Sequence, residues 1–593
     1  MCGINGILRL NNDASPIDRD ELIRTRDYMA KRGPDFANEW ISPSGLVGFG
    51  HRRLAIIDLS PKGTQPMLSK DGRYAIIFNG EIYNYRELRT ELEHNGFSFN
   101  SQSDTEVILA LFIQKGREML SRLRGMYALA IWDDQERYLL LARDPFGIKP
   151  LYYGVQDGVL RFASQVKALE ASRVISLERD PVGVSGFLLW GSVPEPYTFR
   201  RAIRTLPAGH YLSVCNGRIS SPEPYYETYR ASIPLLPDVS SALEDTVRAH
   251  LVSDVPVAVF LSAGLDSSLL TALACRFLPE PPVTFTLRFR SFINTSWDEA
   301  PLAVETARCL GTRHIEKTVD RSDFPDLFEQ AINAMDQPSI DGFNVYVISQ
   351  IAHQAGLKVV LSGLGGDELF GSYPSFHRVP LWTRLASRRL IYRLDPIWRK
   401  FAQWLYPSQP KLPGLLCYGR TLPGAYYLQR ALYLPDELPQ LIGSDIAGIG
   451  LDLYSPVRDA SKPFNLATIE QSDETNDIWY RIHTMESMQY MRNQLLRDSD
   501  WASMAHSIEL RVPFVDLWLH EQLAEMNFEP ARSQGKISLV QQVAPELPKQ
   551  LFNHKKSGFL FPIMEWLDPE PFPKHHWGLE SRKLAIRVLN AFK

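Results

Sequence analysis

The chain has 593 residues, which is more than one hydrophobic core supports and predicts roughly two to four domains. Its composition, 45% hydrophobic and 22% charged, is that of an ordinary globular protein and argues against a disordered chain. A net charge of −4 gives no electrostatic reason to bind nucleic acid or an anionic membrane, and no apolar run reaches the ~18 residues of a membrane span.

Residues 1–190 are predicted to form an α+β domain with sheets in the middle. Short runs of β-forming residues lie at 46–50, 74–78, 138–142 and 160–163. A helix is predicted at 104–114, with Asp104 as the residue that caps its N-terminus. Residues 191–235, which are rich in turn-forming proline and glycine at their start, are predicted to be a connection.

The second residue of the chain is Cys2, a nucleophile at the extreme N-terminus. The initiator methionine is commonly removed when a small residue follows, which would leave Cys2 with a free α-amine. An α-amine has an ordinary pKa of about 7.7–8.0, so a useful fraction is neutral at physiological pH and can accept the thiol proton. Gly3 leaves room for a substrate beside the sulfur. Most cysteines at position 2 are incidental, so this feature needs the motifs that follow.

Four further segments accompany Cys2 in the N-terminal half. They are RGPD at 32–35, HRRLAIID at 51–58, NGEIYN at 79–84 and SDTE at 103–106. Each alone fits an ordinary role, such as a turn asparagine or a capping aspartate. In this order they closely resemble the glutaminase domain shared by asparagine synthetases and other N-terminal-nucleophile amidotransferases. Lys31 and Gln165 replace the usual histidine and glutamate, at positions that are not catalytic in the family pattern.

The resemblance implies roles for the matching residues. Arg53 would bind the α-carboxylate of glutamine, a contact that the guanidinium fork makes well. Glu81 and Asp104 would hold the α-ammonium group. The side-chain amide of Asn79 and the backbone N–H of Gly80 would form the oxyanion hole, and the cysteine would be the nucleophile.

From about residue 240 onward, helical patterns alternate with buried strands. The helices are predicted at 241–251, 267–277 and 300–310, and the strands at 255–261, 283–289 and 357–361. Such alternation predicts an α/β domain with a doubly wound parallel sheet. From about residue 378 the chain is predicted to be mostly helical.

A turn with the sequence SAGLDSS, at 262–268, leads from the strand at 255–261 into a helix. Small residues, a helix N-terminus and two hydroxyl groups suit an anion, although the spacing of a Walker A loop is absent. The turn resembles the pyrophosphate loop, or PP-loop, of enzymes that cleave ATP to AMP and pyrophosphate, with Ala263 in place of the first glycine. The alternative is a serine-rich turn that only caps a helix.

A second loop, SGLGGDELFG at 362–371, also follows a predicted strand. Ligands bind at the carboxyl ends of strands in open α/β sheets, so the two loops are expected to converge. The resemblance implies that Asp266 and Asp367 hold Mg²⁺ on the pyrophosphate of ATP. The expected contacts to ATP in these loops and strands are Phe260, Ser262, Gly264, Asp266, Ser267, Ser268, Leu287, Ser362 and Gly363.

Two signatures near the C-terminus extend the resemblance. ELRVPFVD, at 509–516, contains Arg511, which we interpret as part of a structural ion pair in preference to a support for the site. KKSGF, at 555–559, contains Lys556, at the position where the family lysine meets the phosphates of ATP.

The resemblance to asparagine synthetases covers about residues 1–570. It implies an N-terminal sandwich of the Ntn-hydrolase type, followed by an α/β synthetase of the PP-loop type with a helical C-terminal extension. The implied domains are a glutaminase at 1–190, a connection at 191–235 and a synthetase at 236–593.

The implied reaction uses both halves. Glutamine would release ammonia through a thioester on Cys2, and ATP would adenylate a carboxylate, taken to be the β-carboxylate of aspartate. The products would be asparagine, glutamate, AMP and pyrophosphate. Two alternatives stay open: the same chemistry on another carboxylate in a specialised biosynthetic pathway, and a binding or regulatory protein with an inactive synthetase half. Asp266, Asp367 and Lys556 argue against the second.

Leu364 is the departure that bears most on the acceptor. Many asparagine synthetases have glutamate there, which is thought to assist proton removal as ammonia attacks. Leucine cannot accept a proton, and a positioned base is worth about 10²–10⁴-fold. Either Glu368 or Asp341 removes the proton, or the pocket takes a substrate other than aspartate; we favour aspartate. The segment 336–344 also differs from the commoner version and is expected near the acceptor.

The five cysteines are widely scattered and form no CxxC pair, which predicts neither a disulfide framework nor a zinc cluster. A reducing cytoplasm is the expected location. The expected partners are glutamine, ATP and aspartate, with no nucleic acid and no membrane, and a homodimer is compatible with the sequence.

Overall fold

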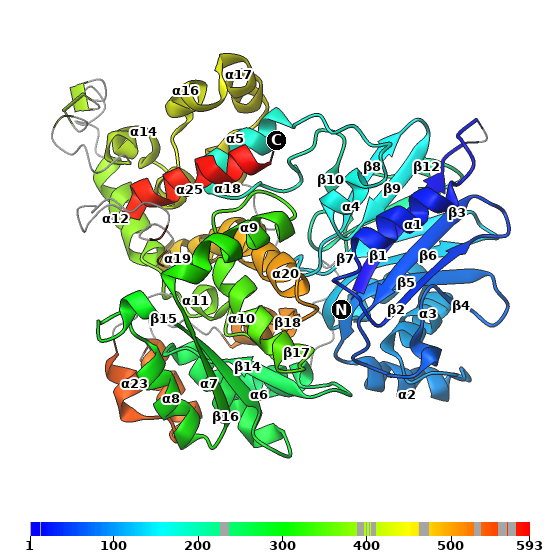
Figure 1. The fold of residues 1–593 in the computed structure, drawn as a ribbon, viewed down its shortest axis with the longest axis horizontal. Coiled ribbons are helices and arrows are strands. Elements are labelled where there is room, and N and C mark those ends of the chain that lie inside the picture. The colour runs from blue at the N-terminus through cyan, green and yellow to red at the C-terminus, as the bar shows by residue number, and fades with distance from the viewer. Residues whose placement is uncertain are drawn as a thin grey trace.

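In the computed structural model, two antiparallel sheets lie on one side of the molecule and a parallel sheet with its helices lies on the other (Figure 1). The structure describes residues 2–11, 13–225, 236–387, 397–398, 400–401, 404, 411–461, 474–526, 535–554, 562, 566 and 577–592.

The two antiparallel sheets make up most of the N-terminal half. Their strands are β1 (Cys2–Arg9), β2 (Phe36–Ile41), β3 (Val47–Arg53), β4 (Met67–Leu68), β5 (Tyr74–Ile82), β6 (Gly125–Asp133), β7 (Tyr138–Arg143), β8 (Tyr152–Gln156), β9 (Val159–Ala163), β10 (Arg204–Thr205), β11 (His210–Cys215), β12 (Arg218–Ile219) and β13 (Glu223–Pro224). The order of the first sheet is β10-β8-β9-β1-β3-β2. The second sheet has the order β12-β11-β7-β6-β5-β4, with β13 paired to β11.

Strand β5 shows why these sheets stack. Ala75 and Ile77 belong to an apolar layer that also contains residues of β1, β3 and β9, whereas Ile76 and Phe78 pack with α2 (Tyr85–His94) and α3 (Asp104–Lys115). Successive side chains of a strand point to opposite faces, so one strand serves both layers. The predicted α+β sandwich is therefore confirmed. Helix α1 (Arg19–Tyr28) contacts β1 and β3 of the other sheet.

The start of α3 differs from the prediction. The cap is Ser103, whose Oγ accepts the N–H of Thr105 at 3.1 Å. Asp104 instead accepts the N–H of Ile82, at the end of β5, at 3.1 Å through Oδ2. Serine and aspartate cap helices about equally well, so the residue types alone could not show which of the two adjacent residues is the cap. The carboxylate of Asp104 is thereby tied to the end of β5.

A parallel sheet forms the centre of the C-terminal half. Its strands are β14 (Val257–Phe260), β15 (Val283–Phe289), β16 (Arg313–Val319), β17 (Val359–Leu361) and β18 (Glu509–Arg511). They lie in the order β16-β15-β14-β17-β18, and each neighbouring pair is parallel. The strand order reverses between β14 and β17, the kind of point where open α/β sheets bind ligands.

Helices cover both faces of this sheet. Val257 and Val259 of β14 pack with α6 (Val239–His250) and α7 (Leu265–Phe277), whereas Ala258 belongs to the cluster that contains α10 (Phe343–Gln354). A strand buried on both faces reads as a continuous apolar run, as this one does. The predicted doubly wound α/β sheet is confirmed, and β14 is shorter at both ends than the predicted strand.

The rest of the described C-terminal half is mainly helical, as predicted. Its helices are α8 (Ala300–Cys309), α9 (Phe324–Ala334), α11 (Gly366–Leu369), α12 (Ser375–Ala386), α14 (Leu415–Tyr418), α15 (Leu422–Arg430), α16 (Leu438–Ile442), α17 (Ser444–Leu453), α18 (Pro456–Ala460), α19 (Glu474–Met485), α20 (Arg497–Met504), α21 (Leu517–Glu525), α22 (Gly535–Val543), α23 (Lys549–Asn553) and α25 (Trp577–Ala591). A π-helix at Glu486–Leu496 joins α19 to α20. Among the described residues, no helix is long and apolar enough to cross a membrane.

Residues 191–235, predicted to be a connection, contribute β10 to β13 to the two antiparallel sheets. The preceding helix α5 (Pro181–Trp190) packs against α17 in the helical region. The limits of the predicted domains stay a prediction.

The two halves meet over a buried junction, and Figure 1 shows the N-terminus at this junction. An apolar cluster there contains Tyr83 and Met126 from one half and Leu364, Met491 and Val512 from the other. Apolar residues from both sides thus share one small core.

Asp336 adds a polar contact across the junction. Its carboxylate accepts the N–H groups of Val166 and Lys167 at 2.9 and 3.0 Å, at the start of α4 (Val166–Glu170). Gln337 accepts the N–H of Phe199 at 3.1 Å. The start of the segment 336–344, expected near the acceptor, therefore contacts the N-terminal half.

Candidate active sites

Cys2 is the first residue of β1, and strand pairing places it opposite Arg53, the last residue of β3. The cysteine is buried, with 7% of its surface exposed. Burial raises the pKa of the Cys2 thiol. A hydrogen bond from the backbone N–H of Leu54 and the charge of Arg53 act in the opposite direction. The thiolate would thus form beside groups that stabilise it once a base takes the proton.

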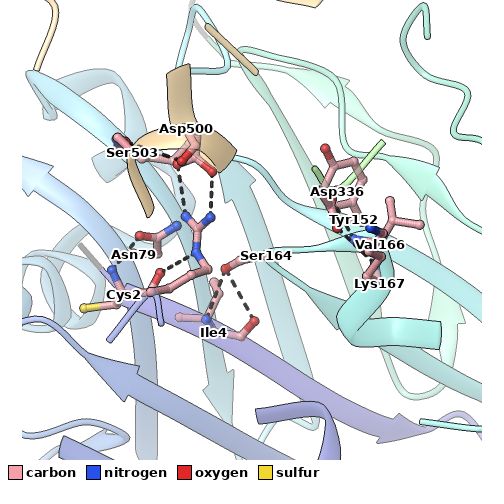
Figure 2. A network of polar contacts seen from close by, with 12 residues as sticks. Cys2, Ile4, Asn79, Tyr152, Ser164, Val166, Lys167, Asp336, Asp500 and Ser503 are labelled. Atoms are coloured by element: carbon pink, nitrogen blue, oxygen red, sulfur yellow. Dashed lines mark hydrogen bonds and ion pairs between the residues drawn. The ribbon is translucent and has the colours of Figure 1, made fainter. Parts of the chain in front are cut away.

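Asn79 lies beside Cys2, and one end of its amide is unused. Oδ1 accepts the backbone N–H of Cys2 at 2.9 Å, as Figure 2 shows. Nδ2 is fully buried and has no hydrogen-bond partner among the described residues. A buried donor without a partner costs about 1–3 kcal/mol. This amide is therefore placed to donate to an oxygen atom of a bound molecule.

Gly80 follows Asn79 on β5 and has no room for a side chain. A Cβ atom there would overlap the carbonyl oxygen of Met126 on β6. Glycine is required for this close approach of two backbones.

Charged groups of both signs lie around Cys2. Arg53 donates to three backbone carbonyl groups of the loop at 57–60. Burial raises the pKa of Glu81 well above its usual range and that of Asp104 to about 6. The Oε2 atom of Glu81 has no hydrogen-bond partner among the described residues. One guanidinium and two carboxylates complement the carboxylate and ammonium groups of a free amino acid.

A buried arginine ties the nucleophile to the C-terminal half. The Nε of Arg32 donates to the carbonyl oxygen of Cys2 at 3.1 Å. Its Nη1 and Nη2 donate to the carboxylate of Asp500, on α20, at 2.6 and 3.0 Å. Figure 2 labels Cys2 and Asp500, the two residues that this arginine connects. Residues 32–35 were recognisable only as part of a motif, because nothing in the sequence marks a partner 468 positions away.

Replacing Arg32 with methionine is expected to lower the free energy of unfolding by about 3–5 kcal/mol, because the buried Asp500 carboxylate would lose its partner. The midpoint of urea unfolding measures the effect. The matched control is Arg19→Met, since Arg19 pairs with Glu39 at the surface, where such a pair contributes about 0–1 kcal/mol. Equal midpoints for the two variants would contradict the importance of the buried pair.

The loop after β14 is held by its own serine residues. The Oγ atoms of Ser262 and Ser267 lie 3.0 Å apart, and Gly264 donates its N–H to Ser262 at 3.1 Å. Ala263, at the departure from the family pattern, is buried. Ser268 is also buried, and its Oγ has no hydrogen-bond partner among the described residues. The loop therefore enters α7 in a fixed turn.

The loop after β17 meets this first loop at very close range. A Cβ atom at Gly363 would crowd the N–H of Ser267, and one at Gly366 would overlap the carboxyl group of Asp266. Ser362 donates its N–H to the carbonyl oxygen of Arg511 at 2.9 Å. The two loops thus converge, and the side chain of Asp266 lies directly against the backbone of the second loop. The remaining residues expected to contact ATP are Phe260, at the end of β14, and Leu287, on β15.

Lys536, on α22, is a candidate site residue that the sequence analysis missed. Its Nζ donates to Asp266 Oδ2 at 2.5 Å and to Asp367 Oδ1 at 3.2 Å. Burial lowers the pKa of Lys536, but the two carboxylates outweigh burial and raise that pKa above its usual value. A lysine after a glycine at a helix start has no distinctive spacing. Lys556, the lysine predicted to meet the phosphates, lies outside the described residues.

The surroundings of Leu364 are apolar, since its side chain packs in the junction cluster. Glu368, one of two carboxylates considered for proton removal, is buried and accepts the hydroxyl of Tyr373 at 3.0 Å through Oε1. Its Oε2 has no hydrogen-bond partner among the described residues. Burial and the charge of Asp367 raise the pKa of Glu368 to about 8. Burial also raises the pKa of Asp341, the other carboxylate.

Comparison with known proteins gives two family matches. The glutamine amidotransferase domain family matches residues 1–226, and the asparagine synthase family matches residues 238–587.

Three relatives align with nearly the whole chain. It is 33% identical to "Asparagine synthetase [glutamine-hydrolyzing] 1" of Bacillus subtilis, over 96% of this chain and 88% of that protein. "Asparagine synthetase [glutamine-hydrolyzing] 3" of the same organism is 29% identical, over 97% of this chain and 87% of that protein. "Amidase chry2" of Gibberella zeae is 28% identical, over 95% of this chain and 90% of that protein. Among solved structures, the allosteric regulatory enzyme of purine biosynthesis overlaps 44% of this chain and 60% of its own, with a TM-score of 0.30 and 18% identity.

Proposed function

This chain belongs to the asparagine synthase family, and we propose that it converts aspartate to asparagine with nitrogen from glutamine and energy from ATP. It is a carbon–nitrogen ligase with glutamine as the amido donor. The observation that carries the proposal is the presence of two prepared sites in one chain. One is the unused amide donor of Asn79 beside Cys2, and the other is the meeting of Asp266, Asp367 and Lys536.

In the glutaminase site, Arg53 binds the α-carboxylate of glutamine, and Glu81 and Asp104 bind its α-ammonium group. Cys2 attacks the side-chain amide carbon, and its α-amine takes the thiol proton. The amide of Asn79 and the N–H of Gly80 stabilise the oxyanion. Ammonia leaves, and water then hydrolyses the thioester to glutamate.

In the synthetase site, the two converging loops bind ATP. Backbone and hydroxyl groups of the first loop face the phosphates, and the adenosine lies against the ends of β14, β15 and β17. The residues proposed for these contacts are Phe260, Ser262, Gly264, Ser267, Ser268, Leu287, Ser362 and Gly363. The unpartnered Oγ of Ser268 supports this role for the first loop.

Asp266 and Asp367 are the residues that would hold Mg²⁺. They fit the ion because they come from two converging loops and both already bind one cation, the ammonium of Lys536. The metal would neutralise charge on the pyrophosphate. The ammonium of Lys536, beside both carboxylates, would balance part of the charge that develops on the phosphates. Lys556 stays a second proposed contact.

The acceptor carboxylate attacks the α-phosphorus of ATP, which forms the acyl-AMP and releases pyrophosphate. Ammonia then attacks the acyl carbon, AMP leaves, and the nitrogen gives up one proton. Ammonia would move from one half to the other out of contact with water, which would protonate it, and the junction between the halves is apolar at Tyr83, Met126 and Leu364. Glu368 is our preferred acceptor for the proton that the nitrogen gives up, because one oxygen of its buried carboxyl group is unused. Asp341 stays the alternative.

A second candidate function is amidation of another carboxylate. Two observations favour it: Leu364 replaces the usual glutamate, and one relative over 95% of the chain is named an amidase. We further propose a homodimer, a cytoplasmic location and the domain limits 1–190, 191–235 and 236–593.

The acceptor is identified by incubating the enzyme with ATP, Mg²⁺, glutamine and a panel of carboxylic acids. Aspartate is expected to give saturable pyrophosphate release, and asparagine should accumulate. The control reaction lacks an acceptor. If aspartate gives no more pyrophosphate than this control while another carboxylate does, the second candidate function replaces the first.

A further inference from the structure

Arg511 touches both candidate sites from a single position on β18. Its carbonyl oxygen accepts the N–H of Ser362, the first residue of the second nucleotide loop, at 2.9 Å. Its side chain reaches the glutaminase half, where Nη2 lies 3.6 Å from Oε2 of Glu81. The guanidinium is fully buried. One residue of the synthetase half therefore lies against a residue proposed to bind glutamine.

The guanidinium is fixed in three directions and has one unused edge. Nε donates to Glu509 at 2.6 Å, and Nη1 donates to the carbonyl oxygens of His250 and Val252 at 2.7 and 2.6 Å. Nη2 has no hydrogen-bond partner among the described residues, and neither has the facing Oε2 of Glu81. Buried polar groups are rarely left unpaired, so two that face each other point to a contact that tightens when a ligand binds.

The charges around Glu81 make this contact necessary. Glu81 is buried, and the carboxylates of Asp104 and Glu509 both oppose its ionisation. Arg511 acts in the opposite direction. A neutral Glu81 could not attract an ammonium group. Within the described residues, Arg511 is the arginine or lysine that forms an ion pair with Glu81.

We propose that Arg511 is a positioning residue for glutamine: its guanidinium holds the Glu81 carboxylate in place to receive the α-ammonium group of the substrate. The inference rests on the proposed function, since it takes Glu81 as part of the glutamine site. Arg511 then has two roles: it forms a structural ion pair with Glu509, and it positions Glu81. The glutamine site is then completed by the synthetase half.

A double-mutant cycle on the full-length protein tests this role. The variants are Arg511→Lys, Glu81→Gln and the double variant, and the readouts are KM and kcat for glutamine hydrolysis. Lysine keeps a positive charge for Glu509 but cannot also direct a fork toward Glu81. Arg511→Lys is expected to raise KM for glutamine by about tenfold or more, with a smaller change in kcat. In the Glu81→Gln background the same change should alter KM by less than about twofold.

Synthesis from saturating ammonium serves as the internal control and should stay within about twofold of the wild type in Arg511→Lys. The matched variant is Arg124→Lys, because Arg124 is another buried arginine that pairs across the junction, with Asp516 at 2.6 Å. It should leave KM for glutamine unchanged.

The outcomes separate the inference from the function on which it rests. If Arg511→Lys raises KM by the same factor in both backgrounds, Arg511 does not act through Glu81, and the inference fails while the proposed function stands. Loss of both activities with a lowered unfolding midpoint would show a purely structural role and would also overturn the inference. If Glu81→Gln alone leaves KM unchanged, the assignment of Glu81 in the proposed function fails.

Discussion

Cys2→Ala is expected to abolish amide synthesis from glutamine while synthesis from added ammonium continues. Removing a catalytic nucleophile costs roughly 10⁶-fold in rate in a well-studied protease. The loops proposed to bind ATP lie on the parallel sheet and do not use the cysteine, so their chemistry should persist. Asparagine and glutamate are measured with either nitrogen source.

The matched control is Cys215→Ala, since Cys215 is an exposed free cysteine in the same half of the protein. It should retain both activities. Glutamine hydrolysis that persists at the wild-type rate in a clean Cys2→Ala preparation would rule out the nucleophile assignment.

Asp266→Asn and Asp367→Asn are each expected to stop the formation of AMP and pyrophosphate and to leave glutamine hydrolysis measurable. Losing a metal ligand leaves the charge of the pyrophosphate uncompensated, an effect of several kcal/mol or roughly 10³-fold in rate. Lys536→Met should act in the same direction, because it removes the ammonium proposed to balance charge on the phosphates. Pyrophosphate release and glutamate release are followed in parallel.

Asp326→Asn is the control for these variants, since Asp326 is exposed on α9. Wild-type pyrophosphate release in Asp266→Asn or Asp367→Asn would refute the metal role of that residue. A normal rate in Lys536→Met would refute the role of the lysine alone.

The fold was predictable where local pattern and burial agree. The continuous apolar run around β14 predicted a strand buried on both faces, and the structure has helices on both sides of it. In β5, successive side chains point to opposite faces of the sheet, so the strand packs against both layers of the sandwich. The exact cap of α3 was not predictable, because Ser103 and Asp104 are adjacent and both are good caps. The local sequence of 191–235 also gave no indication that its strands pair with the two antiparallel sheets.

The candidate sites were predictable where residues come in compact motifs. Cys2, Asn79 and Glu81 belong to short segments that a single chain reveals. Lys536 does not, because it reaches Asp266 only through the placement of α22 against the sheet. The contact between Arg511 and Glu81 likewise depends on how two separately folded sheets face each other. Long-range contacts of charged side chains have no period or spacing that a sequence pattern can detect.

The buried ion pairs across the junction restrict how the halves of this protein can be exchanged. Arg32 is paired with Asp500, and Arg124 with Asp516, each with one partner in each half. A chimera that joins the first half of this chain to the second half of a relative would inherit only one member of each pair. Unless the relative carries an equivalent acidic residue at both places, the hybrid would contain buried unpaired charge. The two halves are therefore expected to descend and diverge as a unit, with substitutions at positions 32 and 500 occurring together.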